Sequence, residues 1–197
     1  MTARSRILLA LASLALLAVY VLPLWHITLD APQYPEGLGM YIEVNTIRGQ
    51  NPGNLESING LNHYIGMRPI VPDSIPELKI LPWVFGFLIG FGLLGAALGK
   101  RWMLTAWVVL FALVMIVSLA DFYRWGYDYG HNLDEATAII KVPGMTYQPP
   151  VIGTKQMLNI TASSWPAAGG WIAFGAFLIG LVALVLERRR STRLEVA

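Results

Sequence analysis

Three histidines and three Gly-Met dipeptides are the residues whose types could hold a metal ion. The histidines are His26, His63 and His131, and the dipeptides are Gly39-Met40, Gly66-Met67 and Gly144-Met145. Imidazole and thioether ligands together select copper, especially Cu(I), where cysteine is absent. Glycine beside methionine lets the backbone bend so that thioethers can converge. We therefore predict transient copper binding by His63, Met67, Met40, Met145 and His131.

The sequence also limits which other chemistry is open to the chain. It contains no cysteine, which excludes disulfides, thiolate metal sites, Cys-ligated iron–sulfur clusters and a covalently attached haem. HExxH, GxSxG and glycine-rich phosphate-loop motifs are also absent from the sequence, so we predict no enzyme activity. The alternative to metal binding is that the methionines among these candidate ligands fill gaps in a core and that the exposed histidines have no special role.

The composition of the chain is typical of a membrane protein, so membrane-spanning helices are the elements expected to position these residues. Hydrophobic residues make up 55% of the 197 residues and charged residues 13%, against roughly 25% charged in soluble domains. Apolar runs long enough to span a bilayer occur at residues 7–24, 82–99, 102–120 and 170–186. None contains Asp, Glu, Lys, Arg or His, which argues against a channel or transporter and leaves no histidine pair for a membrane haem.

Basic residues predict how these spans are oriented. The segments 1–6, 100–101 and 187–197 hold eight bases and two acids, a balance of +6, whereas the rest of the chain holds six bases and ten acids, a balance of −4. Because cytoplasmic segments are enriched in Lys and Arg, we predict four spans in a bacterial inner membrane with both termini in the cytoplasm. The net charge of +2 gives no reason to expect a nucleic-acid partner.

Small residues in the second span predict close helix packing. Gly86 and Gly90 are four residues apart, as are Gly95 and Gly99, and this spacing lets a second helix approach closely. We favour packing within the four-helix bundle over a dimer contact. The short connection at 100–101 makes spans two and three a tight antiparallel hairpin.

The remaining segments, 25–81 and 121–169, make up about half of the chain and are too long to be simple connections. We predict that they fold into one small mixed extracytoplasmic domain, so the fold class is membrane α-helical with four transmembrane helices. The divisions are 1–24, 25–81, 82–120, 121–169 and 170–197. Alternating apolar residues predict strands at 40–46 and 138–142.

A short helix is predicted over residues 55–67. Leu55, Ile58, Leu61 and Ile65 form its apolar stripe at helical spacing. On such a helix His63 and Met67 would be neighbours on the opposite side, free to bind a metal.

The segment 121–131 is rich in aromatic and charged residues. Its ordinary interpretation is a cap on the bundle at the level of the lipid headgroups. The alternative is a docking surface, because Tyr, Trp and Arg are typical anchors of protein interfaces.

The longer motifs of the predicted outer segments resemble those of a known family. They are LDAPQYPEGLGM at 29–40, LNHYIGM at 61–67, YDYGHNL at 127–133 and PGMTYQPP at 143–150. Together they resemble a family of small four-span membrane proteins associated with nitrous-oxide-reductase gene clusters. The resemblance implies a part in denitrification, either maturing a periplasmic copper enzyme or supplying it with metal.

These observations predict a non-enzymatic inner-membrane accessory protein. It would act as a metal chaperone, binding Cu(I) transiently on its outer domain, for a periplasmic copper enzyme, nitrous oxide reductase, or for the maturation factors of that enzyme. The rival hypothesis is a membrane platform without metal that docks a periplasmic reductase or cytochrome as a structural or electron-transfer partner. A quinol-oxidising subunit is disfavoured, because the spans offer no cofactor ligands.

Overall fold

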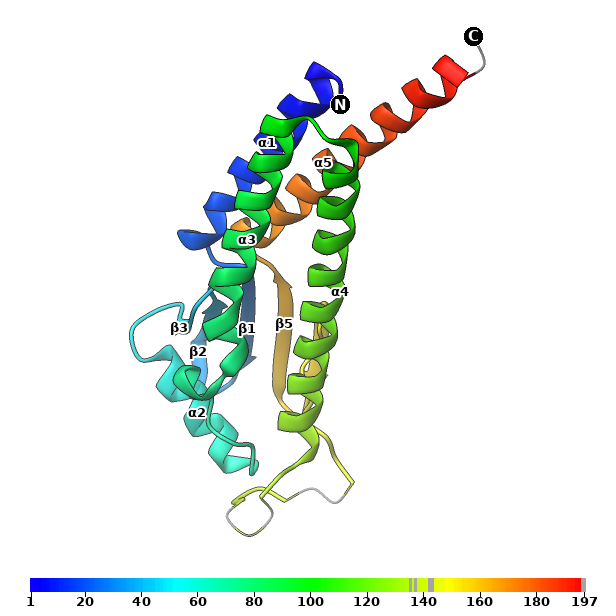
Figure 1. The fold of residues 1–197 in the computed structure, drawn as a ribbon. Coiled ribbons are helices and arrows are strands. Elements are labelled where there is room, and N and C mark those ends of the chain that lie inside the picture. Colours follow the sequence, from blue (N-terminus) through cyan, green and yellow to red (C-terminus); the bar gives the residue numbers. More distant parts are fainter. Residues whose placement is uncertain (135, 137, 142–143, 196–197) are drawn as a thin grey trace.

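The structure is a computed structural model that describes residues 1–134, 136, 138–141 and 144–195, the last six of them as backbone. Two parts are evident in Figure 1: a bundle of long helices and, at one end of it, a domain built on a β-sheet. We call the latter the sheet domain (residues 22–75 and 121–167). The opposite end of the bundle, which holds both termini and the turn at 100–101, is called the basic end.

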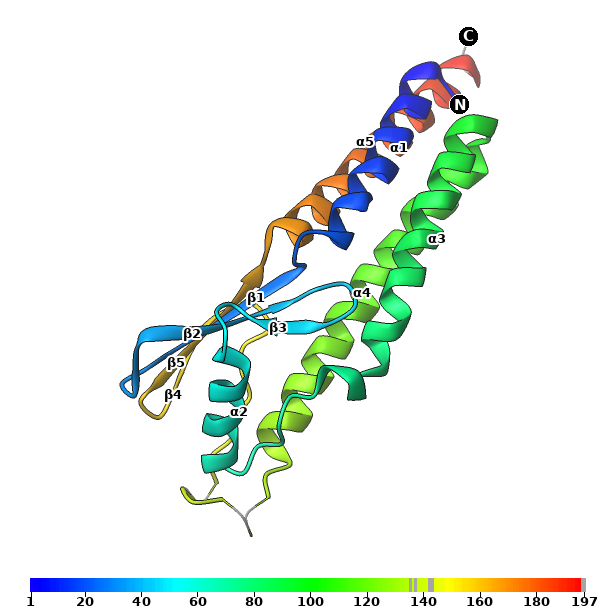
Figure 2. The same ribbon diagram turned by 90° about the vertical axis from the view of Figure 1, so that its left-hand side faces the viewer.

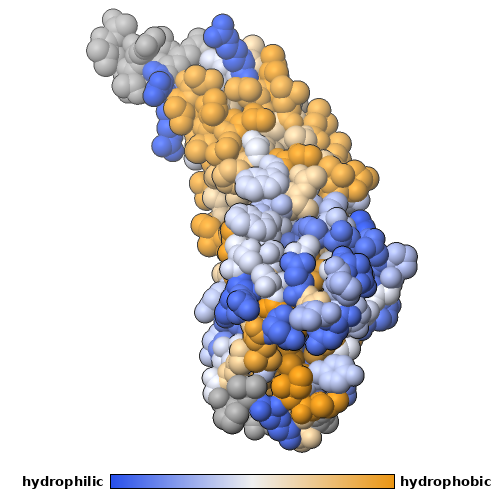
Figure 3. Space-filling model, turned by 180° about the vertical axis from the view of Figure 1, so that it is seen from behind, coloured by the Kyte–Doolittle hydropathy of each residue, from blue (hydrophilic) through white to orange (hydrophobic). Residues whose placement is uncertain are grey.

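Four helical segments of the described chain are long and apolar enough to cross a membrane. They are α1 (Ala3–Ala15) with its 3₁₀ continuation η1 (Leu16–Tyr20), α3 (Pro76–Leu98), α4 (Arg101–His131) and α5 (Ala168–Glu195). Figure 3 shows their apolar surface as a band that adjoins polar residues at the basic end and a mostly polar part of the sheet domain. This confirms the four predicted spans as helices, although α4 continues eleven residues past the predicted end at residue 120.

The bundle packs around the indole of Trp107, which is fully buried. Its Nε1–H donates to the Leu88 carbonyl of α3 at 2.8 Å, so the one polar atom of the ring is satisfied inside an apolar core. Gly95 lies against Leu9 of α1 and Met103 of α4, which is packing within the bundle. Gly99 instead ends α3 in the left-handed conformation, with φ 68°.

Strands from the two predicted outer segments, 25–81 and 121–169, form one antiparallel sheet in the order β3-β2-β1-β5-β4. The strands are β1 (Trp25–Ala31), β2 (Tyr34–Ile42), β3 (Ile47–Gly49), β4 (Gly153–Met157) and β5 (Ile160–Pro166). The central pair continues the bundle, because β1 follows η1 and β5 leads into α5 (Figure 2). The sheet is therefore tied to the bundle through two neighbouring strands.

The predicted strands were largely wrong in position. The strand expected at 40–46 ends at Ile42, and a turn closed by the Glu43 N–H on the Thr46 carbonyl at 2.8 Å leads into β3. The strand expected at 138–142 is absent from the described residues 138–141. There the Ile139 and Ile140 N–H groups both donate to the Tyr64 carbonyl, at 3.0 and 2.8 Å, so this backbone caps a helix and pairs with no strand.

Helix α2 (Asn54–Tyr64) covers one face of the sheet. Ile58 on its inner side is 2% exposed and packs with Ile27, Leu38 and Met40. The predicted stripe is confirmed for Leu55, Ile58 and Leu61, which all belong to this core. The helix is shorter than predicted, however, because it ends at Tyr64.

Candidate functional site at the tip of the sheet domain

The end of the sheet domain farthest from the basic end is formed by the last turns of α2 and α4 and the segments that follow them (Figure 1). We call this surface the tip and define it as residues 62–69, 127–134, 138–141 and 144–148. It contains four of the five predicted metal ligands: His63, Met67, His131 and Met145.

Backbone hydrogen bonds hold the end of α2 against the chain that leaves α4. The Asp134 N–H donates to the Gly66 carbonyl at 2.8 Å, beside the paired contacts to Tyr64. Gly66 has φ 76°, and a Cβ at this position would lie 2.8 Å from the Asp134 carbonyl oxygen. Only glycine fits here, because both the backbone conformation and the close approach exclude a side chain.

Side chains connect the segment that follows α2 to the last turns of α4. Arg68 forms an ion pair with Asp128, and its guanidinium lies over the ring of Tyr129, 5.4 Å from the centroid. The Tyr129 hydroxyl donates to the Pro69 carbonyl at 3.4 Å. These residues lie sixty positions apart in the sequence, so spacing alone could not pair them.

His131 has the local environment of a potential ligand. Its Nδ1 lies 2.9 Å from the Tyr127 carbonyl, and its ring stacks on that of Tyr127 at 3.8 Å between centroids. A carbonyl can only accept, so Nδ1 carries the proton, which leaves the lone pair of Nε2 for a metal. Histidine ligands in metal sites are commonly oriented by this kind of backbone contact.

His63 and Met67 reach the tip by a different geometry from the predicted one. The helix ends before Met67, and the Met67 N–H donates back to the Asn62 carbonyl at 2.9 Å across the left-handed Gly66, a Schellman-type end. The predicted i, i+4 relation on one helix is therefore wrong. Both residues still lie at the tip, where His63 is exposed and Met67 is half-buried.

The segment that carries Met145 runs back along the last turns of α4. The Tyr147 N–H donates to the Gly130 carbonyl at 3.0 Å, and Gly130 allows Gln148 to approach closely. Met145 is half-buried two residues before this contact. Met145 therefore lies on the tip, two residues from a backbone contact with the residue before His131.

Met40 does not belong to the tip. It lies on β2 beneath α2, is 8% exposed and packs with Ile27 and Ile58. This is the ordinary core role that the sequence left open. His26 is also remote, since it lies near the start of β1.

The aromatic segment predicted as a cap or docking surface is the continuation of α4 into the sheet domain. Its aromatic residues differ in burial. Trp125 is half-buried and packs against Tyr129 at 5.4 Å, whereas Tyr123 and Tyr127 are exposed. Arg124 pairs with Glu77 of α3 and with Asp121 at 3.0 and 2.7 Å, which ties α4 to the start of α3.

Sequence reasoning missed a row of side chains across the other face of the sheet. Trp165, His26, Tyr41 and Arg48 are direct cross-strand partners on β5, β1, β2 and β3. His26 stacks on Tyr41 at 4.4 Å, and the Arg48 guanidinium lies 4.8 Å from the Tyr41 centroid. They line a hollow of about 430 Å³ beside Pro23 and Ala168. Only strand register brings these residues together.

The tip can offer imidazole and thioether groups, but carboxylates and histidines do not cluster there. Among the described residues, His, Asp and Glu form no group of three or more that could hold a metal ion. A site at this surface would therefore depend on methionine sulfur, a ligand that favours Cu(I) over zinc.

Comparisons with known proteins leave the family open: no protein-family model matches the sequence, and a search of characterised proteins finds none that matches it.

Proposed function

We propose that the protein is a membrane-anchored accessory protein that binds Cu(I) transiently at the tip through His63, Met67, His131 and Met145. The arrangement around His131 carries the proposal. Its Nδ1–H is held by the Tyr127 carbonyl, and the residue belongs to the tip, which also contains Met67 and Met145.

The ligand set suits a donor that must release its metal. Thioethers hold Cu(I) less tightly than thiolates, and this chain has no cysteine. Met40 is left out of the proposed site because its side chain is in the core. The resemblance noted from the sequence supports a periplasmic copper enzyme, nitrous oxide reductase, or its maturation factors as the receiver of the metal.

Exposed apolar side chains at the tip support contact with a protein partner. Ile139, Ile140, Tyr64 and Tyr127 all expose nearly half of their surface or more. An exposed apolar surface of this kind is typical of an interaction site. The same observation favours the second candidate function, a metal-free platform that docks a periplasmic reductase or cytochrome.

Competition with a chromogenic Cu(I) chelator tests the copper function on the purified full-length protein. We expect the wild type to withdraw Cu(I) from the chelator, and His131→Ala and the double variant His63→Ala/Met67→Ala to withdraw less. His26→Ala and Met157→Leu are matched controls that change the same residue types outside the tip, and both should behave as the wild type. Met40→Leu should also retain binding.

Two results would reject copper binding. The first is a wild type that competes no better than the tip variants. The second is equal loss in the His26 control, which would indicate non-specific imidazole binding. With copper binding rejected, a partner cross-linked through the tip would support the docking platform.

A further inference from the structure

A groove between α1 and α3 opens at the basic end of the bundle. Its volume is about 450 Å³. The lining residues are Ala3, Arg6, Ile7 and Ala10 from α1 and Leu93, Ala96 and Ala97 from α3. Apart from Arg6 these side chains are apolar, and most are alanine, so the groove is a recess in the lipid-facing surface.

The groove runs from the basic end toward the middle of the membrane-crossing region. Helices α1 and α3 are antiparallel, so Ala10 and Leu93 lie about one turn deeper than Arg6 and Ala97. The walls at the deep end offer only hydrocarbon contacts. A linear acyl chain fits this shape and polarity.

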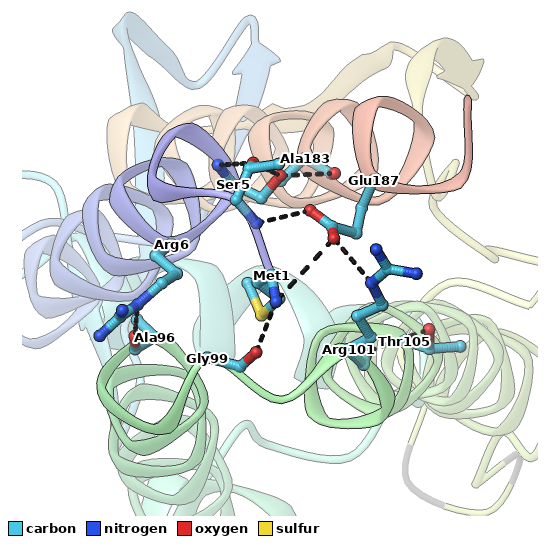
Figure 4. A network of polar contacts seen from close by, with 10 residues as sticks. Met1, Ser5, Arg6, Ala96, Gly99, Arg101, Thr105, Ala183 and Glu187 are labelled. Atoms are coloured by element: carbon cyan, nitrogen blue, oxygen red, sulfur yellow. Dashed lines mark hydrogen bonds and ion pairs between the residues drawn. The ribbon is translucent and has the colours of Figure 1, made fainter. Parts of the chain in front are cut away.

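Arg6 holds a fixed position at the mouth of the groove. Its Nε–H donates to the Ala96 carbonyl at 2.7 Å (Figure 4). An Nη2–H donates to the Ala97 carbonyl, also at 2.7 Å. These carbonyls belong to the last turn of α3, where a cation also counters the helix dipole. A guanidinium has five N–H groups, so three remain for an oxygen ligand outside the protein.

The charge around the mouth of the groove is positive, because the carboxylate at this end of the bundle, Glu187, interacts with Thr2 and Arg101. Glu187 is 3% exposed and accepts the Thr2 N–H at 2.9 Å, and one of its carboxylate oxygens lies 2.8 Å from Arg101 Nε. Figure 4 shows this group on the opposite side of Met1 from Arg6. Arg4 and Lys100 are exposed at the same end. A phosphate near Arg6 would therefore meet cations and little opposing charge.

We infer that this groove binds one anionic phospholipid of the leaflet at the basic end. An acyl chain lies along Ile7, Ala10 and Leu93, and the phosphate accepts hydrogen bonds from Arg6. Basic pockets between membrane helices are suited to such headgroups. Phosphatidylglycerol is preferred over phosphatidylethanolamine, because the mouth has cations for the phosphate and no exposed carboxylate of the described chain for an ammonium group.

Native mass spectrometry of the full-length protein, released from detergent containing equal amounts of phosphatidylglycerol and phosphatidylethanolamine, tests this inference. We expect phosphatidylglycerol to be retained preferentially by the wild type. Arg6→Gln should lower its retention roughly fivefold, the change that about 1 kcal/mol per basic residue near a membrane surface corresponds to. Arg189→Gln is the matched control, because Arg189 is an exposed base of the same end that does not line the groove.

A second variant tests the groove without changing charge. Ala10→Leu/Ala97→Leu fills the recess, so it should lower phosphatidylglycerol retention while Arg6 is intact. This double variant still tests the lipid site if Arg6→Gln fails to fold. Equal retention of the two lipids by the wild type would overturn the inference. So would equal losses in the Arg6 and Arg189 variants, or full retention by the filled groove.

Discussion

The six-membered ring of Trp107 on α4 lies directly against Gly180 on α5, where a Cβ would overlap the ring. The same indole donates to the Leu88 carbonyl of α3. One side chain therefore joins three helices of the bundle. The absence of a side chain at residue 180 is what makes room for it.

Gly180→Ala should destabilise the protein. The added methyl group meets a buried ring held by a hydrogen bond, and overpacking of this kind costs typically 1–3 kcal/mol. Thermal unfolding in detergent measures the change. Gly175→Ala on the same helix is the control, since a Cβ there meets nothing within 4 Å. Equal melting temperatures for the two variants would contradict the packing described for Trp107.

Gly66→Ala should detach the connection between α2 and the chain after α4. Its φ of 76° and the Asp134 carbonyl at 2.8 Å both oppose a Cβ. Gly53→Ala separates these effects, because Gly53 has φ 82° with open space around it. The free energy of unfolding of the Gly53 variant should fall by only about 1–2 kcal/mol, the cost of placing a non-glycine residue in the left-handed conformation. Faster protease cleavage within 132–141 in the Gly66 variant alone would verify the connection, and equal cleavage in both would refute it.

Trp125→Ala should lower stability far more than Tyr123→Ala. The indole is half-buried and packed against Tyr129, whereas Tyr123 is exposed. Truncation of a fully buried large aromatic side chain costs about 3–5 kcal/mol, so the half-buried indole should cost part of this, whereas exposed substitutions usually fall within about 0.5 kcal/mol. Chemical or thermal unfolding gives both values. A Tyr123 variant that unfolds as readily as the Trp125 variant would show that the exposed ring also has a structural role.

The orientation predicted from charge can be tested with single cysteines, because the sequence has none. Glu36→Cys in the sheet domain and Lys100→Cys at the basic end place exposed thiols on opposite ends of the bundle. A membrane-impermeant maleimide should label Glu36→Cys in intact cells and Lys100→Cys only after permeabilisation, because the basic end is expected to face the cytoplasm. The opposite labelling pattern would show that the predicted orientation is wrong. It would also contradict the proposal of a periplasmic partner for the sheet domain.

Hydropathy predicted the helical bundle well, because an uninterrupted apolar run of span length has few other uses. The strands were harder to predict. β2 contains Pro35, Gly37 and Gly39, residues that disfavour strands in isolation, and its pairing with β1 overrides that preference. Residues 138–141 have strand-like side chains, but their amides bind the end of α2 instead.

The candidate site was also predictable only in part, because residue types are read from the sequence whereas contacts between distant residues are not. Residue types indicated which side chains to follow. The four histidine and methionine positions of the tip could be placed on one surface only through contacts between distant residues, such as Arg68 with Asp128. The helical spacing of His63 and Met67 was misleading, because Gly66 stops the helix between them. Met40 was the first residue of the strand predicted at 40–46, but its place in the core depends on the pairing of β2 with β1 and on the cover by α2.

Helix α4 is continuous for 31 residues, a length of about 46 Å at 1.5 Å per residue. A hydrocarbon layer is about 30 Å thick, so roughly 16 Å of rigid helix projects from it. His131 therefore ends a rigid extension of α4 beyond the length needed to cross the hydrocarbon layer, and the ion pair of Arg124 with Glu77 ties this extension to the start of α3. The tip is therefore held away from the apolar band of the bundle by continuous helix, which fixes its position more firmly than a flexible loop would.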